Sequence, residues 1–146
     1  MKNASGATLT SGIDWKAAQR AAEAAAEKAM ELGARINVSV VDAAGLPLAF
    51  LRMPGAPLHS ISICEDKAYT AVSFGLPTSA WAEELKKHSE AVRQGLLQRP
   101  RTALFGGGIP IIIDGMLAGA IGVSGSSEQY DEQCAKAGLA ACGWLA

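Results

Sequence analysis

Residues 36–52 read INVSVVDAAGLPLAFLR, and residues 109–123 read IPIIIDGMLAGAIGV. Each stretch contains two runs rich in β-branched and aliphatic residues on either side of a short turn sequence. The first turn spans residues 42–45, and the second is the dipeptide Asp114 and Gly115, which favours a tight hairpin turn. We therefore predict two antiparallel hairpins. Their strands cover residues 36–41, 46–52, 109–113 and 116–123.

The predicted strands are apolar on both faces instead of alternating between apolar and polar residues. This pattern indicates a sheet that is covered on both sides. An alanine-rich segment at residues 13–33 supplies the first covering helix, with Ser11 as the candidate N-cap and Gly33 as a left-handed stop. Its many small side chains would let it lie close to the sheet.

Three further helices are predicted from the spacing of apolar residues. Two lie between the hairpins, at residues 58–74 and at residues 80–98, and the last begins with a capping box of Ser126 and Gln129. The order is α-β-β-α-α-β-β-α, and strands adjacent in sequence pair with each other. The chain is therefore predicted to be an α+β protein with a central antiparallel sheet and helices packed on it, and not a parallel Rossmann fold.

The composition restricts the possible classes of function. The chain has 146 residues, of which 49% are apolar and 18% charged, with a formal net charge of −1. This suits one domain, at residues 13–146, after a loose arm at residues 1–12. The chain lacks a basic stripe for nucleic acid, and no apolar run reaches the roughly 18–20 residues that span a membrane. The absence of a signal-peptide core and an odd count of three cysteines predict a cytoplasmic protein with reduced thiols.

The helix predicted at residues 58–74 has two dissimilar faces. Helical geometry places one apolar face toward the sheet. The other face mixes a histidine and a lysine with apolar residues, which is unusual for a surface exposed only to solvent. Three interpretations are open for this face: it packs under the next helix, it forms a subunit interface, or it lines a ligand pocket. The sheet-facing residues are Ile61, Cys64, Ala68, Ala71 and Val72, and the mixed face holds His59, Ile63, Lys67, Thr70 and Phe74.

His59 is the stronger candidate of the two histidines for iron binding or proton transfer near neutral pH, because His88 lies in a polar, exposed stretch. A lone histidine is also commonly structural. Lys67 is either a functional residue or a surface lysine whose stem covers apolar neighbours. Cys64 is expected in the core, on a different face from His59.

Two loops are rich in small residues. Phe105 and the glycines at residues 106–108 enter a strand, either as a bulge or because a ligand approaches the main chain closely. The turn at residues 124–127 runs into a helix N-terminus, where exposed amides either attract a carboxylate or phosphate or are simply capped. Asp131 and Cys134 lie one turn apart on the helix that follows, and they form either a polar spot or part of the helix surface.

Three segments in this order resemble the GlcG/HbpS family of small haem-associated proteins, whose module also forms the C-terminal part of PduO-type proteins. They are RMPGAPLHSISICEDKAYTAVSFGLPT at residues 52–78, FGGGIPIIIDGMLAGAIGVSG at residues 105–125 and CAKAG at residues 134–138. The resemblance covers roughly residues 13–143. Two positions depart from the family pattern: Pro54 replaces an aspartate, and His59 stands where a small residue is usual.

The resemblance implies a central antiparallel sheet flanked by helices, and a homo-oligomer. Several members bind haem, and some are credited with haem sensing or degradation. Relatives in aromatic degradation pathways include 4-hydroxylaminobenzoate lyases, which release ammonia. Since one fold hosts several activities, the resemblance leaves the chemistry open.

The leading hypothesis is a small-ligand-binding protein with haem as its ligand. One alternative is a lyase that acts on a small aromatic acid and uses His59, Lys67 or Tyr69 in proton transfer, and a further alternative is a structural assembly module. If haem binds, His59 is the expected iron ligand and Tyr69 the reserve. The candidate ligand-binding residues are Arg52, His59, Ile63, Thr70, Phe74, Phe105, Gly106, Gly107, Gly108, Ser124, Gly125 and Ser126.

Overall fold

The computed structural model describes residues 5–10 and 12–145. Within these residues the chain forms five α-helices, two short 3-10 helices and four strands. No helix in this part of the chain is both long and apolar enough to cross a membrane. The elements are α1 (Trp15–Leu32), β1 (Asn37–Asp42), β2 (Pro47–Arg52), α2 (Ser60–Phe74), α3 (Trp81–Glu84), α4 (Glu90–Leu97), β3 (Gly108–Ile113), β4 (Met116–Ser124) and α5 (Glu128–Ala141).

The four strands form one antiparallel sheet in the order β2-β1-β4-β3. Both predicted hairpins are confirmed, and β1 pairs with β4 to join them. In the second hairpin Asp114 and Gly115 both have positive φ, 52° and 76°, as a tight turn between twisted strands requires. The α+β class with a central antiparallel sheet is therefore confirmed.

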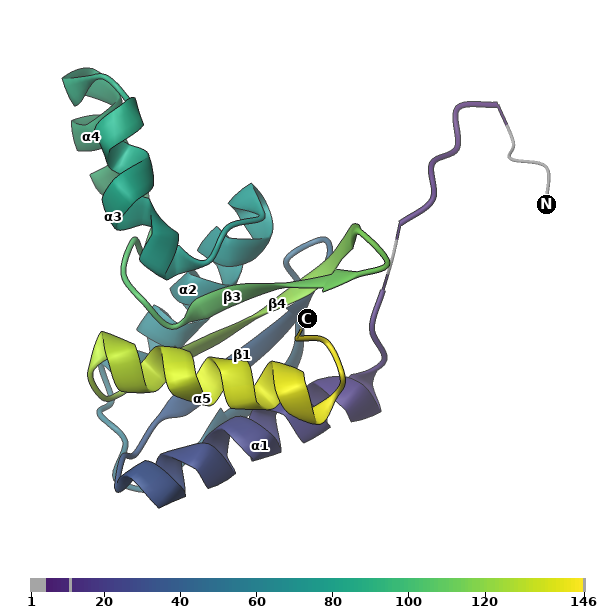
Figure 1. The fold of residues 1–146 in the computed structure, drawn as a ribbon, viewed down its shortest axis with the longest axis vertical. Coiled ribbons are helices and arrows are strands. Elements are labelled where there is room, and N and C mark those ends of the chain that lie inside the picture. The colour runs from purple at the N-terminus through teal and green to yellow at the C-terminus, as the bar shows by residue number, and fades with distance from the viewer. Residues whose placement is uncertain (1–4, 11, 146) are drawn as a thin grey trace.

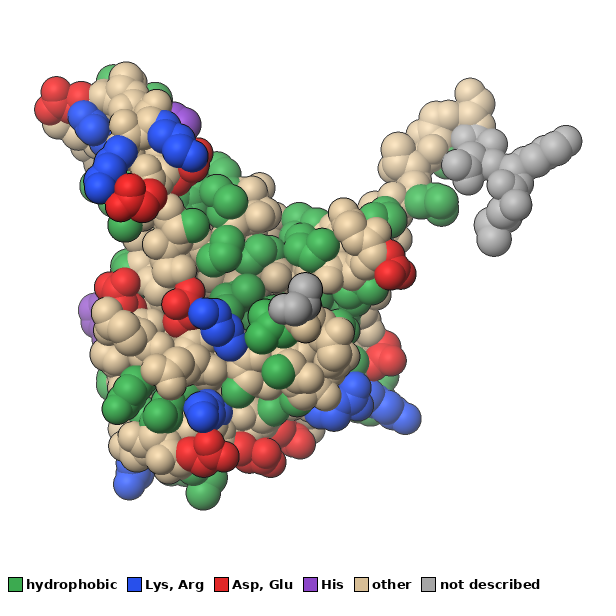
Figure 2. All heavy atoms as spheres, viewed as in Figure 1, with side chains coloured by type: hydrophobic (Ala, Val, Ile, Leu, Met, Phe, Trp, Pro, Cys, Tyr) green, Lys and Arg blue, Asp and Glu red, His purple; other side chains and the backbone are tan. Residues whose placement is uncertain are grey.

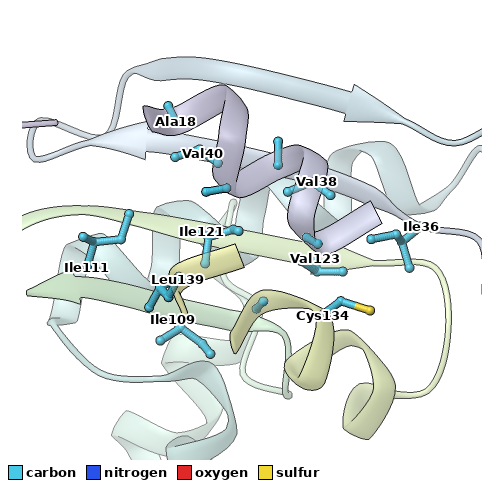
Figure 3. Close-up of a cluster of buried hydrophobic side chains, with 14 of the residues drawn as sticks. Ala18, Ile36, Val38, Val40, Ile109, Ile111, Ile121, Val123, Cys134 and Leu139 are labelled. Carbon is cyan, nitrogen blue, oxygen red and sulfur yellow. The ribbon is translucent and has the colours of Figure 1, made fainter. Parts of the chain in front are cut away.

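Helices cover the sheet on both faces, which gives three layers (Figure 1). Helices α1 and α5 lie side by side on one face, and α2 crosses the other. The core between the sheet and the α1–α5 pair consists of alanines of α1 and branched residues of the strands (Figure 3). Small residues bring the layers close: a Cβ atom at Gly138 of α5 would lie 2.7 Å from the carbonyl oxygen of Ala21 in α1.

The helix ends differ in part from the predicted caps. Gly33 ends α1 in the left-handed conformation, as predicted, but the side chain of Asp14 caps its start. The predicted cap Ser11 lies outside the described residues. At α5 the capping residue is Ser127, whose hydroxyl accepts from the amide of Tyr130, so the predicted capping box of Ser126 was placed one residue too early.

The single helix predicted at residues 80–98 is wrong. His88 is extended (φ −108°, ψ 160°), and the hydroxyl of Ser89 caps a new helix, α4, by accepting from the amide of Val92. Ser89 favours a cap over a helix interior, because its side chain competes for backbone hydrogen bonds. The α3–α4 segment projects from the body of the molecule (Figure 1).

The prediction that both faces of the sheet are covered is confirmed, but the coverage is incomplete at β2. This strand lies at the edge of the sheet, and the side chain of Phe50 is 47% exposed. In contrast, residues 37–41 of β1 are buried, because β1 lies between two other strands and under helices on both faces. At the N-terminus, the described residues 5–10 are exposed and lie away from the sheet (Figure 1).

Candidate functional site

The mixed face of α2 holds a buried ion pair. The Nζ atom of Lys67 lies 3.1 Å from Oδ2 of Asp131 in α5, and the two side chains are 1 and 2% exposed. Nζ also donates to the carbonyl of Val123 at 2.9 Å and lies 4.8 Å from the centre of the Phe105 ring. The alternative that Lys67 is a surface lysine is therefore wrong, and so is the alternative that Asp131 lies on a helix surface.

Opposing effects act on the two charges of this pair. Burial lowers the pKa of Lys67 and raises the pKa of Asp131, while the attraction between the two groups opposes both shifts. The other carboxylate oxygen of Asp131 accepts from the amide of Ser126 at 3.0 Å. The turn after β4 thus has an anion bound to it, as its exposed amides suggested, but that anion is the chain's own Asp131.

The glycines at residues 106–108 are explained by close packing. A Cβ atom at Gly107 would lie 2.4 Å from the Val123 carbonyl oxygen and 2.7 Å from Nζ of Lys67, and its φ is +132°. A Cβ atom at Gly108 would lie 2.4 Å from the backbone oxygen of Lys67. The amide of Gly108 donates to the hydroxyl of the buried Thr78 at 2.8 Å. These glycines therefore let the loop pack directly against α2 and β4, and their contact with a ligand stays a prediction.

Thr70 connects α2 to the chain just before this loop. Its buried hydroxyl donates to the carbonyl of Arg101 at 3.0 Å and accepts from the amide of Ala103 at 3.1 Å. The guanidinium of Arg101 lies 3.7 Å from the centre of the Tyr69 ring. The second face of α2 therefore packs mainly under residues 101–108, and only its end, at Phe74, contacts the segment at residues 80–98 through Trp81.

His59 lies at the start of α2, apart from this cluster. Its side chain is exposed, and among the described residues no hydrogen bond or ion pair joins it to the glycine loop. Three side chains in or next to the sheet hold the chain before it by donating to backbone carbonyl oxygens: Arg52 to Ala56, Arg35 to Pro54 and Asn37 to Pro57. Arg52 thus braces the loop that leads to His59.

The remaining candidates lie in different surroundings. Cys64 is fully buried, as expected, and burial raises the pKa of its thiol to about 12. Ile63 is half-buried, whereas Phe74 is 48% exposed and packs edge-on against Trp81 at 4.8 Å. The other histidine, His88, is partly exposed and lies 3.6 Å from Glu84.

Sequence reasoning missed two partners of the α2 residues. The sequence suggests for Asp131 only a polar spot or a place on the helix surface, although a carboxylate one turn into a helix after a glycine–serine turn is a recognisable anion ligand for that turn. No local sequence pattern marks Arg101, because it is distinguished by its backbone conformation and not by its neighbours in the chain. Its φ of 60° is visible only in the structure.

Together these features define a small three-layer α+β protein, built on two antiparallel hairpins and closed by a buried lysine–aspartate pair. Comparison with known proteins also shows its family. The chain belongs to the HbpS-like family, described as "Haem degrading protein HbpS-like", which matches residues 13–140.

Individual relatives agree with this assignment. An uncharacterized 15.0 kDa protein of the dhaT-dhaS intergenic region of Citrobacter freundii is 34% identical, over 87% of this chain and 89% of that protein. The crystal structure of HbpS superposes with a TM-score of 0.84 at 35% identity, over 96% of each chain. The PduOC complex with haem has a TM-score of 0.81 at 31% identity, over 89% of this chain and 94% of that one. The names of these three relatives do not mention a lyase, so that hypothesis stays a prediction.

Proposed function

We propose that this protein binds haem and that the imidazole of His59 is the iron ligand. The observation that carries the proposal is the solved PduOC–haem complex, which shares this fold at 31% identity. Haem supplies, when bound, an iron centre whose reactivity depends on its protein ligand and on the polarity around it. The finer activities implied by the resemblance, sensing and degradation, depend first on this binding.

The residues around His59 are chemically suited to this role. An exposed imidazole without a side-chain partner among the described residues is free to bind iron. The neighbouring Leu58 is 77% exposed, and it offers apolar surface to a porphyrin edge. The main chain at His59 is also fixed, because its carbonyl accepts from the hydroxyl of Ser62 and the preceding loop is braced by Arg52.

The first prediction compares the two histidines of the chain. Haemin titration followed by the Soret band should give at least roughly tenfold weaker affinity for His59→Ala, because the variant loses its iron ligand. His88→Ala is the matched control and should bind like the parent, since His88 lies beside Glu84 on the projecting segment. Circular dichroism should show both variants folded.

Two results would contradict the assignment of His59. If the folded His59→Ala variant keeps the parent's affinity and spectrum, His59 is not the ligand. If Tyr69→Phe alone abolishes the Soret shift, the reserve ligand Tyr69 takes its place, and haem binding itself stands. A parent protein without any Soret shift would refute the proposed function as a whole.

We also propose that the protein is a homo-oligomer. Helix α4 has no buried residue, and its Val92 and Leu97 are 42 and 64% exposed. An eight-residue helix is marginal in water on its own, so a second copy packed against it explains its formation. Figure 2 shows acidic and basic side chains interspersed along this projecting segment, which suits a partner carrying the same mixture.

The second prediction is that light scattering at micromolar concentration gives a mass well above the 15.0 kDa of one chain. Leu97→Glu should lower that mass, because it places a charge on the apolar side of α4. Leu9→Glu, at another exposed leucine outside the projecting segment, is the control and should leave the mass unchanged. A monomeric parent would contradict the proposal.

A further inference from the structure

A cavity that does not include His59 lies between the C-terminal half of α2 and the chain that follows α4. Its volume is about 450 Å³, within the range of small-ligand sites. Tyr69 and Phe74 supply aromatic surface, Leu96 supplies aliphatic surface, and Arg99 and Arg101 supply two guanidinium groups. Tyr69 follows His59 by ten residues on α2, which corresponds to about 15 Å along a helix axis.

Arg101 is held in a conformation that an arginine rarely adopts. Its φ is 60°, in the left-handed region that favours glycine. The Thr70 hydroxyl, on a residue that is 2% exposed, bonds to the chain at Arg101 and Ala103 and so fixes this backbone. A strained backbone that persists at the rim of a cavity suggests that the side chain it carries is needed there.

Two guanidinium groups line the cavity, those of Arg99 and Arg101. None of its described lining residues is acidic. The nearest carboxylate to Arg101 is that of Asp66, 3.8 Å from Nε, and among the described residues Arg99 forms no ion pair. The Arg101 guanidinium lies over the Tyr69 ring, 3.7 Å from its centre, and a stacked guanidinium keeps donors in its plane for an anion.

We infer that this cavity binds a small planar carboxylate, with Arg99 and Arg101 holding the carboxylate and Tyr69 and Phe74 packing on the ring. Both parts of such a ligand find a partner here. A bidentate guanidinium suits the geometry of a carboxylate, and the aromatic and aliphatic lining suits an apolar ring. The carboxylate of Asp66 competes with the ligand for the Arg101 guanidinium and should weaken binding.

The experiment uses benzoate as the probe, with benzamide as its neutral counterpart and inorganic phosphate as an anion without a ring. We expect the parent to bind benzoate more tightly than either, in calorimetric titrations and in amide NMR shifts of Arg99 and of residues 101–103. Arg101→Gly should weaken benzoate binding about tenfold or more, because it removes a charge-assisted bidentate contact. Asp66→Asn should strengthen binding, because it removes the competing carboxylate.

The choice of glycine separates binding from folding. Glycine takes a positive φ without steric cost, so the backbone conformation at this position should be kept in Arg101→Gly, and circular dichroism should show the variant folded. The matched control is Arg93→Gln, which removes an exposed guanidinium of α4 that does not line the cavity. It should leave benzoate binding unchanged.

The outcomes are distinct from those of the haem proposal. His59→Ala should bind benzoate like the parent whether or not haem binding is lost. The inference is overturned if the parent does not bind benzoate, if benzamide or phosphate binds as tightly, or if folded Arg101→Gly binds like the parent. It is also overturned if His59→Ala loses benzoate binding, since the two sites would then be one.

Discussion

Replacing Lys67 by methionine should lower the free energy of unfolding by about 3–5 kcal/mol, the range expected when one partner of a buried ion pair is removed. The substitution leaves the Asp131 carboxylate buried without its counter-charge. Methionine fills most of the space of the lysine stem, so the lost charge and not a cavity causes the effect. Urea unfolding followed by circular dichroism measures the difference.

The matched control is Lys28→Met. Lys28 pairs with Glu31 at 3.2 Å, almost the same distance, but on the surface, where an ion pair contributes about 0–1 kcal/mol. Adding Asp131→Asn to Lys67→Met should restore part of the loss, because the amide oxygen still accepts from Ser126 and no charge stays buried. A Lys67→Met protein as stable as the parent would show that the pair does not hold α2 to α5.

This loss should depend on pH in a defined direction. Burial raises the pKa of Asp131 above its ordinary value, and removing Lys67 takes away an effect that lowers it. A group whose pKa is raised by folding favours the folded state in acid and disfavours it as the pH rises. The difference between Lys67→Met and the parent should therefore be largest at neutral pH and smaller in acid.

Gly122→Ala should cost about 3 kcal/mol of stability, the upper end of the usual range for overpacked cores. A Cβ atom at this position of β4 would lie 2.1 Å from the carbonyl oxygen of Cys64 and 2.5 Å from the amide nitrogen of Ala68. Both atoms belong to the backbone of α2, so no flexible side chain can move aside. The helix would have to shift away from the sheet, and thermal unfolding should report the change.

Gly95→Ala is the control for Gly122→Ala, because it adds the same methyl group where there is room for it. A Cβ atom at Gly95, in α4, would meet nothing within 4 Å, and alanine favours a helix over glycine by about 0.5–1 kcal/mol. This variant should therefore not lower the melting temperature. Neither glycine has a positive φ, so backbone strain does not enter the comparison. Equal stability of Gly122→Ala and the parent would mean that α2 does not lie as close to β4 as described.

The substitutions at Lys67 and at Gly122 also bear on function, because α2 carries both proposed sites. His59 stands at its start, and Tyr69 and Thr70 lie toward its end. Gly122 and the Lys67–Asp131 pair set the position of the helix on the sheet. A shift of α2 would move Thr70 relative to Arg101 and Ala103, and with it the proposed carboxylate site.

The local sequence determined the two hairpins, the family and most helix positions. Turn residues such as Asp114 and Gly115 act within a few positions of themselves, and helical periodicity is read over one or two turns. Gly33 likewise ends α1 where it was expected, because a left-handed stop depends on one residue. Errors occurred where neighbouring serines compete for a cap, as at Ser126 and Ser127, and where a helix makes few contacts, as at residues 80–98.

Only the tertiary structure decided what the second face of α2 does. Lys67 and Asp131 are 64 positions apart in the chain, and Thr70 and Arg101 are 31 apart. No local pattern connects such residues, because their contact depends on how α2, α5 and the chain after α4 pack on the sheet. That packing buried a lysine that could equally have been a surface residue. It also placed Arg101 over Tyr69, because the Thr70 hydroxyl holds a backbone conformation that sequence alone does not favour for arginine.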